Sequence, residues 1–133
     1  MEEEINESGK IYAVSSPKEL ALSIAEILDH KLAEDIKVLH VTEKTIIADY
    51  FVIATGRSST QIRALEGDVE FEIEKSGLKV GHIEGYSEAN WICMDYHSVI
   101  VHIFNKENRD LYRIEKLWDD AEEIDISDVL TER

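Results

Sequence analysis

The sequence predicts a single α/β (α+β) domain in which helices pack against a mixed five-stranded sheet. Its 133 residues match the size of one domain that can bury a hydrophobic core. Apolar residues at helical spacing alternate along the chain with short runs rich in branched residues, in the order helix, strand, strand, helix, three strands, helix. We assign residues 15–121 to this domain, between a flexible acidic leader (1–14) and an acidic tail (122–133).

The first helix is expected over residues 17–32. A serine stands near the N-cap, Pro17 lies in the first turn and Glu19 follows, which is typical of a helix start. Apolar residues at helical spacing predict its buried face: Leu20, Ile24, Ile27, Leu28 and Leu32.

Two strands are expected next. Residues 35–41 alternate and are rich in branched side chains, as in a strand. Residues 50–54 form a continuous apolar run, which is typical of a central strand covered on both faces. The run ends at Gly56, and the hydroxyl residues 58–60 supply the N-cap of the following helix.

That second helix is expected over residues 59–76, with Gly77 ending it. Its buried stripe consists of Ile62, Leu65, Val69 and Ile73. Three short strands joined by hairpin-like links are then expected at about 79–84, 90–96 and 98–104.

A last helix is expected over residues 106–118. Its inward residues are predicted to be Leu111, Ile114, Leu117 and Trp118. From Asp119 onward the chain is acidic without an extended apolar pattern, so we expect it to be disordered.

The charge of the chain limits its partners. It has 14 Lys and Arg against 29 Asp and Glu, a formal net charge of −15 with an estimated pI of about 4.6. Such a surface repels phosphate backbones, so we expect no primary binding to nucleic acid. The same field attracts a basic protein, although solubility alone would also account for the charge.

Cysteine usage and the absence of apolar runs predict a cytoplasmic protein. The single cysteine, Cys93, can form no internal disulfide, which suits a reducing compartment. No run is long enough to cross a bilayer, and the acidic first ten residues do not resemble a signal peptide.

One pattern suggests an enzyme. The turn at Gly56, followed downstream by Asp68 and Glu70, is similar to the Gly-Ser turn and paired magnesium-binding acids of nucleotidyltransferases. Acids two residues apart point the same way on a strand but diverge on a helix. Because Asp68 and Glu70 lie in a predicted helix, we interpret them as solvated charges and expect no catalytic residues, no metal and no cofactor. A nucleotidyltransferase-like enzyme that uses these two acids is the alternative interpretation.

The histidines form no recognisable site. His82, His97 and His102, with Cys93 and Asp95, lack the short fixed spacings of zinc ligands. A Cys–His nucleophilic pair stays open, but nothing in the sequence favours it.

Aromatic and acidic residues gather near the predicted hairpins, from Gly85 to Trp91 and from Asp95 to His97. Protein-binding surfaces use such residues, whereas a tryptophan can equally belong to the core. The residues alone do not decide between these two interpretations.

From about Ala33 to Ala121 the chain resembles the ribosomal silencing factor family, also called the Iojap-like family. The matching stretches are residues 48–56 (ADYFVIATG), 81–85 (GHIEG), 91–96 (WICMDY), 99–104 (VIVHIF) and 111–118 (LYRIEKLW). The resemblance implies a fold similar to nucleotidyltransferases without their magnesium-binding carboxylates.

The resemblance also implies a function. Family members bind the fourteenth protein of the large ribosomal subunit on its subunit-joining face, block docking of the small subunit and lower translation; related organelle proteins are linked to large-subunit assembly. On the positions that match the family, we place the partner-binding surface at Trp91, Asp95 and Tyr96, with Glu84 and Tyr86 as further candidates. Trp91 would be the aromatic anchor, and Asp95 and Glu84 would pair with basic groups.

Three points stay open. His97 stands in a turn where relatives commonly carry glycine. Neither the leader nor the tail lies in the resembling region. Exposed strand edges and aromatic hairpins also allow a homodimer, and the sequence does not determine the oligomeric state.

Overall fold

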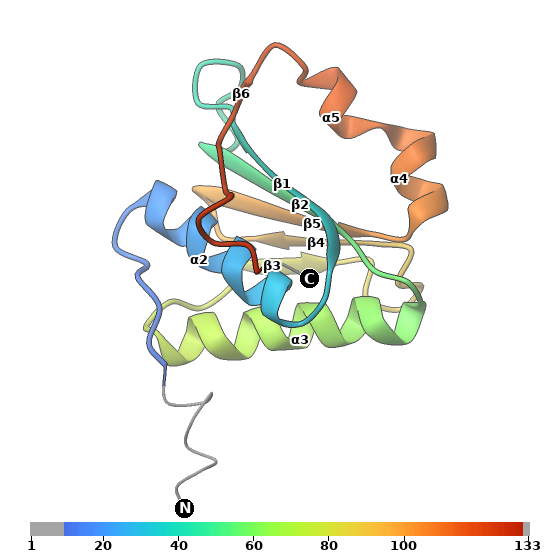
Figure 1. Cartoon of the computed structure of the whole chain (residues 1–133), viewed down its shortest axis with the longest axis horizontal. Helices are drawn as coiled ribbons and strands as arrows, with labels where there is room; N and C mark the ends of the chain where they lie inside the picture. Colours follow the sequence, from blue (N-terminus) through green and yellow to red (C-terminus); the bar gives the residue numbers. More distant parts are fainter. Residues whose placement is uncertain (1–9, 132–133) are drawn as a thin grey trace, which may run out of the picture.

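A computed structural model describes residues 10–131, which form one α+β unit around a six-stranded mixed sheet (Figure 1). In chain order the elements are α2 (Pro17–His30), β1 (Glu34–His40), β2 (Tyr50–Thr55), α3 (Ser59–Lys75), β3 (His82–Glu84), β4 (Trp91–Asp95), β5 (Val99–Phe104), α4 (Lys106–Tyr112), α5 (Ile114–Leu117) and β6 (Glu122–Glu123). The predicted fold class is confirmed, with six strands in place of five. No helix within these residues is long and apolar enough to cross a membrane.

The centre of the sheet is a parallel pair. The strand order is β3-β4-β5-β2-β1-β6; β2 and β5 are parallel, and every other neighbouring pair is antiparallel. All six residues of β2 are buried, as its continuous apolar sequence predicted.

One face of the sheet is covered by α2 and α3, which lie below it in Figure 1. Both helices begin as predicted, because the hydroxyls of Ser16 and Ser58 accept hydrogen bonds from the N–H groups of Glu19 (3.2 Å) and Gln61 (3.1 Å). The main hydrophobic core fills the layer between these helices and the strands.

The other face carries a smaller cluster beneath α4 and α5. Phe51, Ile53, Phe104 and Ile114 are buried in it, and Trp118 packs against it. Figure 1 places α4 and α5 above the sheet, on the side away from α2 and α3.

The expected helix over residues 106–118 is in fact two helices. Arg113 adopts the left-handed conformation (φ 48°), which ends α4 and starts α5 in a new direction. Leu111 and Leu117 are consequently 72% and 74% exposed, so the prediction that both face the core was wrong. The predicted burial of Ile114 is confirmed.

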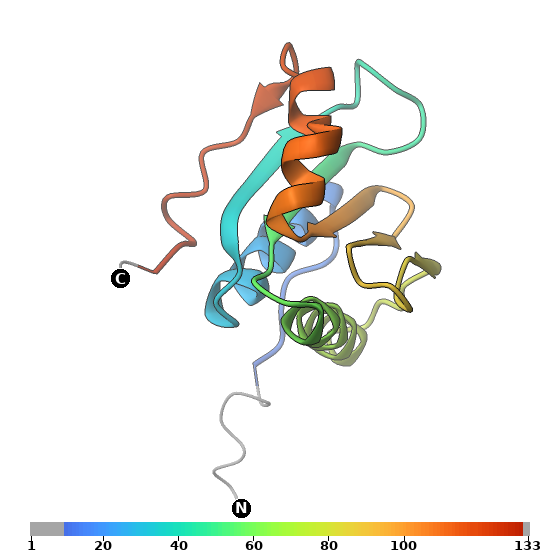
Figure 2. The same ribbon diagram turned by 90° about the vertical axis from the view of Figure 1, so that its right-hand side faces the viewer.

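The C-terminal residues are ordered along the domain, contrary to our expectation of disorder. Figure 2 shows β6 beside β1, with the chain then running back toward α2. Ile126 is buried in the main core, and the N–H of Thr131 donates to the carboxylate of Asp29 at 2.8 Å. The sixth strand lies in this segment, where we had placed a tail.

The described part of the predicted leader also packs on the domain. Tyr12 is buried in the main core, and its N–H donates to Ser76 Oγ at 2.8 Å. The carbonyl of Ala13 accepts from Ser23 Oγ at 2.7 Å. Residues 1–9 lie outside the described residues.

Two hairpins shape the β3–β4–β5 half of the sheet. At Gly85 φ is +87°, and a Cβ there would lie 2.1 Å from the carbonyl oxygen of Trp91. In the turn between β4 and β5, His97 has a positive φ (73°), and the N–H of Ser98 donates to the carbonyl of Tyr96 at 2.9 Å. A positive φ is disfavoured for a residue with a side chain, so glycine would adopt this conformation at a lower cost than His97 does.

Helix α3 carries a buried acid. Glu66 on α3 is 4% exposed, and its Oε2 has no partner among the described residues. Burial, together with a hydrogen bond and charge repulsion from Glu70, raises the pKa of Glu66 to about 8. Tyr96 lies nearby in the core; burial and the carboxylates of Glu70, Glu66 and Glu74 raise its pKa strongly.

We predict that Gly85→Ala destabilises the protein by roughly 2–4 kcal/mol, because the new Cβ overlaps backbone and the positive φ disfavours alanine. Gly67→Ala in the middle of α3 is the matched control. A Cβ at Gly67 meets nothing within 4 Å, so we expect this variant to gain about 0.5–1 kcal/mol from helix propensity. Urea denaturation of both variants measures the difference, and equal effects would contradict the close approach at Gly85.

We predict that Glu66→Gln flattens the dependence of stability on pH. Because the pKa of Glu66 is about 8 in the folded protein and near 4.5 when unfolded, the wild-type protein binds more protons when folded and loses stability as pH rises between these values. Between pH 6.5 and 8 the variant is expected to lose less stability than the wild type, by about 1–2 kcal/mol.

The control is Glu88→Gln, which makes the same substitution at an exposed hairpin position. Urea denaturation of both variants at both pH values measures the change in stability. If both variants lose less stability than the wild type by the same amount, the lower net negative charge causes the effect and not the burial of Glu66.

Candidate protein-binding surface

Three of the five predicted surface residues share one face of the sheet. On β4, Trp91, Cys93 and Asp95 alternate with the buried residues Ile92 and Met94. Glu84 on β3 lies directly opposite Cys93, so its side chain is on the same face. This face is the one opposite α2 and α3.

Trp91 is the fixed centre of this face. Its ring stacks on Phe104 (centroids 4.8 Å apart) and packs at a tilt against Tyr112 of α4 (4.9 Å). Its indole N–H donates to Nδ1 of His102 at 3.1 Å. The side chain is only half-buried, so a rigid aromatic surface remains available to a partner.

Helices α4 and α5 extend the same side with exposed apolar side chains. Leu111 is 72%, Tyr112 48% and Leu117 74% exposed. We call the set Glu84, Trp91, Asp95, Leu111, Tyr112 and Leu117 the contact surface. The three helical residues were missed in the sequence because an unbroken amphipathic helix was expected, and no glycine or proline marks the break at Arg113.

Tyr96 lies elsewhere. It follows Asp95 directly, so it points to the opposite face, where its side chain is 4% exposed in the main core. A side chain in that position cannot meet a partner, and the contact surface does not include it.

Tyr86 is 49% exposed in the β3–β4 hairpin, but it is tied to α3. The guanidinium of Arg63 lies over its ring, 5.7 Å from the centroid. The same group donates to the backbone carbonyls of Tyr86 (3.1 Å) and Ser87 (2.5 Å). Arg63 therefore holds the hairpin that carries Tyr86 against α3.

Asp95 and Glu84 also have local partners. Asp95 Oδ1 accepts from the N–H of His97 at 2.7 Å and so stabilises the β4–β5 turn. Glu84 Oε2 lies 2.9 Å from Nε2 of the exposed His82. Both carboxylates keep oxygens for further contacts at the surface.

Cys93 and His102 do not form an activated nucleophile. Burial, with the nearby charge of Glu84, raises the pKa of the Cys93 thiol to about 11, while burial lowers the pKa of His102 to about 4. Both groups are thus neutral at pH 7, although Sγ lies 3.5 Å from Nδ1. They act as packing beneath Trp91.

The acids of the nucleotidyltransferase pattern are not arranged as metal ligands. Asp68 and Glu70 both lie on α3, as expected, where positions two apart diverge. Among residues 10–131 no group of three or more His, Cys, Asp or Glu could hold a metal ion.

Comparison with known proteins agrees with this description. The sequence model of the family described as "Ribosomal silencing factor during starvation" matches residues 14–133. The chain is 39% identical over 97 residues to the ribosomal silencing factor RsfS of Bacillus subtilis, covering 73% of this chain and 82% of that protein. It is 33% identical over 116 residues to the protein of the same name from Halalkalibacterium halodurans, covering 87% and 99%.

More distant relatives and a solved structure extend the comparison. A mouse protein named "Mitochondrial assembly of ribosomal large subunit protein 1" is 32% identical over 101 residues, covering 71% of this chain and 43% of that protein. A crystal structure of a Chromobacterium violaceum protein superimposes with a TM-score of 0.71 at 28% identity, covering 80% and 87% of the two chains. The chain belongs to the ribosomal silencing factor family.

Proposed function

We propose that this protein binds the large ribosomal subunit and sterically blocks its association with the small subunit, which represses translation in the cytoplasm. The partner we propose is a basic ribosomal protein on the subunit-joining face, the fourteenth of the large subunit. Membership of the silencing factor family supports a ribosome-associated role.

The contact surface is the observation that carries this proposal. Leu111 and Leu117 are strongly exposed, which is unfavourable for apolar side chains in water, and Tyr112, the neighbour of Leu111 in the chain, packs on the half-buried ring of Trp91. These apolar and aromatic side chains, together with the carboxylates on β3 and β4, suit a partner that offers an apolar area surrounded by basic side chains.

The net charge of −15 supports the choice of partner. It speeds the encounter with a basic ribosomal protein and opposes binding to ribosomal RNA itself. Blocking subunit joining needs only a rigid body held by a modest interface, so the function requires no catalytic group.

A role in large-subunit assembly is the second candidate. The name of the mouse relative favours it. The same contact surface would serve either role, because binding one face of the subunit can stabilise a precursor or exclude a partner.

Sedimentation of purified subunits separates the two roles. The protein is added at increasing concentration to large and small subunits, which are then resolved on a sucrose gradient. Silencing predicts co-sedimentation with the large subunit and fewer joined ribosomes. Binding without loss of joining would favour assembly, and binding to neither subunit would overturn both.

We predict that Leu117→Asp weakens binding to the large subunit by roughly tenfold or more, because it places an unpaired charge in an apolar contact. Phe71→Asp is the matched control: Phe71 is 58% exposed on α3, across the sheet from the contact surface. Both substitutions replace an exposed apolar side chain by a carboxylate, so folding should be preserved equally. Equal affinities of the two variants for purified large subunits would rule out this surface.

A further inference from the structure

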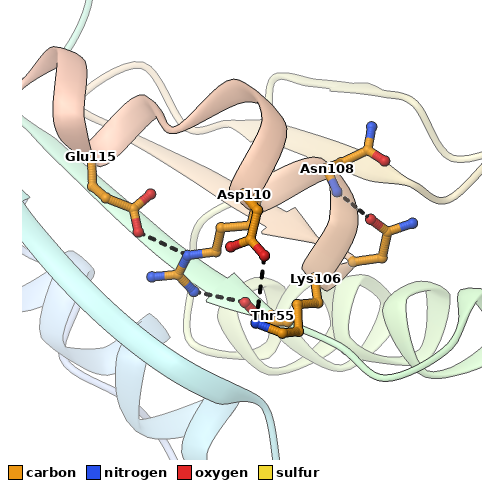
Figure 3. Close-up of polar contacts among 7 residues, drawn as sticks. Thr55, Lys106, Asn108, Asp110 and Glu115 are labelled. Carbon is orange, nitrogen blue, oxygen red and sulfur yellow. Dashed lines mark hydrogen bonds and ion pairs between the residues drawn. The ribbon is translucent and has the colours of Figure 1, made fainter.

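A second surface feature lies on the far side of α4. A cavity of about 410 Å³ opens where β2 ends, between β1 and the α4–α5 segment. Thr55, the last residue of β2, lines it, and Figure 3 shows Thr55 facing the helices that carry Lys106, Asp110 and Glu115. Sheets with parallel strands commonly bind ligands beyond the carboxyl ends of those strands.

The cavity is basic in a strongly acidic protein. Five of the 14 Lys and Arg residues of the chain line it, against three carboxylates. The basic residues are Lys37, Lys106, Arg109, Arg113 and Lys116. The five cations outnumber the three carboxylates of the lining, so this concave site attracts an anion locally although the net charge of the chain is −15.

Arg109 is held in place as a binding group. Its side chain is 7% exposed; Nη1 donates to Thr55 Oγ1 at 2.7 Å and Nε donates to Glu115 Oε2 at 3.0 Å. These two bonds fix the guanidinium before any ligand arrives and leave Nη2 to donate. A preorganised guanidinium is well suited to phosphate oxygens.

Most of the acids in the cavity are already neutralised. Glu115 pairs with Arg109, and Asp110 lies 3.5 Å from Nζ of Lys106. Arg113 and Lys116 are exposed, and neither has an ion pair within residues 10–131. Arg113 and Lys116 are therefore left to neutralise a ligand, and Asp35, the third carboxylate of the lining, offsets part of their charge.

Glu115 adds a second requirement. Its Oε1 is buried and has no hydrogen-bond partner among the described residues. A buried carboxylate oxygen calls for a donor, such as a hydroxyl or amino group. The ligand that fits carries both an anionic group and a hydrogen-bond donor.

We propose that this cavity binds a small phosphorylated metabolite that bears hydroxyl groups, of the size of a nucleoside monophosphate. The phosphate contacts Arg109, Arg113 and Lys116, and a hydroxyl donates to Glu115 Oε1. The cavity volume of about 410 Å³ suits a small-molecule site. The acidic remainder of the surface opposes a polynucleotide, whose neighbouring phosphates would meet repulsion.

The test is titration of the full chain with AMP and with adenosine, in magnesium-free buffer, by calorimetry and by amide chemical shifts. We expect AMP to bind and to shift the amides of Thr55, Arg109 and Glu115, and adenosine not to bind. Inorganic phosphate should compete with AMP. The absence of AMP binding at millimolar concentration, or equal binding of adenosine, would overturn the proposal.

Charge-reversal variants locate the site. Lys116→Glu should weaken AMP binding by about tenfold, since it replaces an attractive charge by a repulsive one. Lys18→Glu is the control with the same change in net charge, at an exposed position on α2 across the sheet. Equal losses of AMP affinity in both variants would mean that the attraction is non-specific and would overturn the proposed site. Tighter binding of a single-stranded RNA oligonucleotide than of AMP would mean that the ligand is a nucleic acid and not a metabolite.

Discussion

The parallel pairing of β2 with β5 is the constraint from which the other features follow. Residues Tyr50 to Thr55 lie in register with Val99 to Phe104 at the centre of the sheet. The chain must cross over between these strands, and α3 makes that crossing on the same face as α2. Both central strands end at the same edge of the sheet. From that edge the chain continues from β5 into α4, which covers the face opposite α2 and α3.

The second face is only partly covered as a result. Helices α4 and α5 are short, and the left-handed residue Arg113 between them turns Leu111 and Leu117 outward while Ile114 stays buried. The two proposed sites lie on either side of this segment: Tyr112 packs on Trp91 of the contact surface, and Arg109 reaches Thr55 in the basic cavity. One helical segment thereby serves both.

Most of the fold could be predicted because it depends on local patterns. The apolar run 50–54 and the serines before both long helices identify a buried strand and two helix starts directly.

The contact surface was predicted only in part. Trp91, Asp95 and Glu84 share a face, whereas Tyr96 is one residue beyond Asp95 and therefore points into the core. Strand β6 contains only two glutamates and depends on distant pairing with β1, so no local pattern indicated it. The hydrogen bond of Arg109 to Thr55 joins residues 54 positions apart, so no local pattern could indicate it either.

The most direct test of the central claim is site-specific crosslinking to the ribosome. A photoreactive benzoylphenylalanine replaces Tyr112, which is 48% exposed beside Trp91, or Phe71 on α3 as the reference position. With purified large subunits, the proposed interface predicts a crosslink from position 112 to one basic ribosomal protein and none from position 71. Crosslinks from position 71 alone, or from position 112 only to ribosomal RNA, would contradict it.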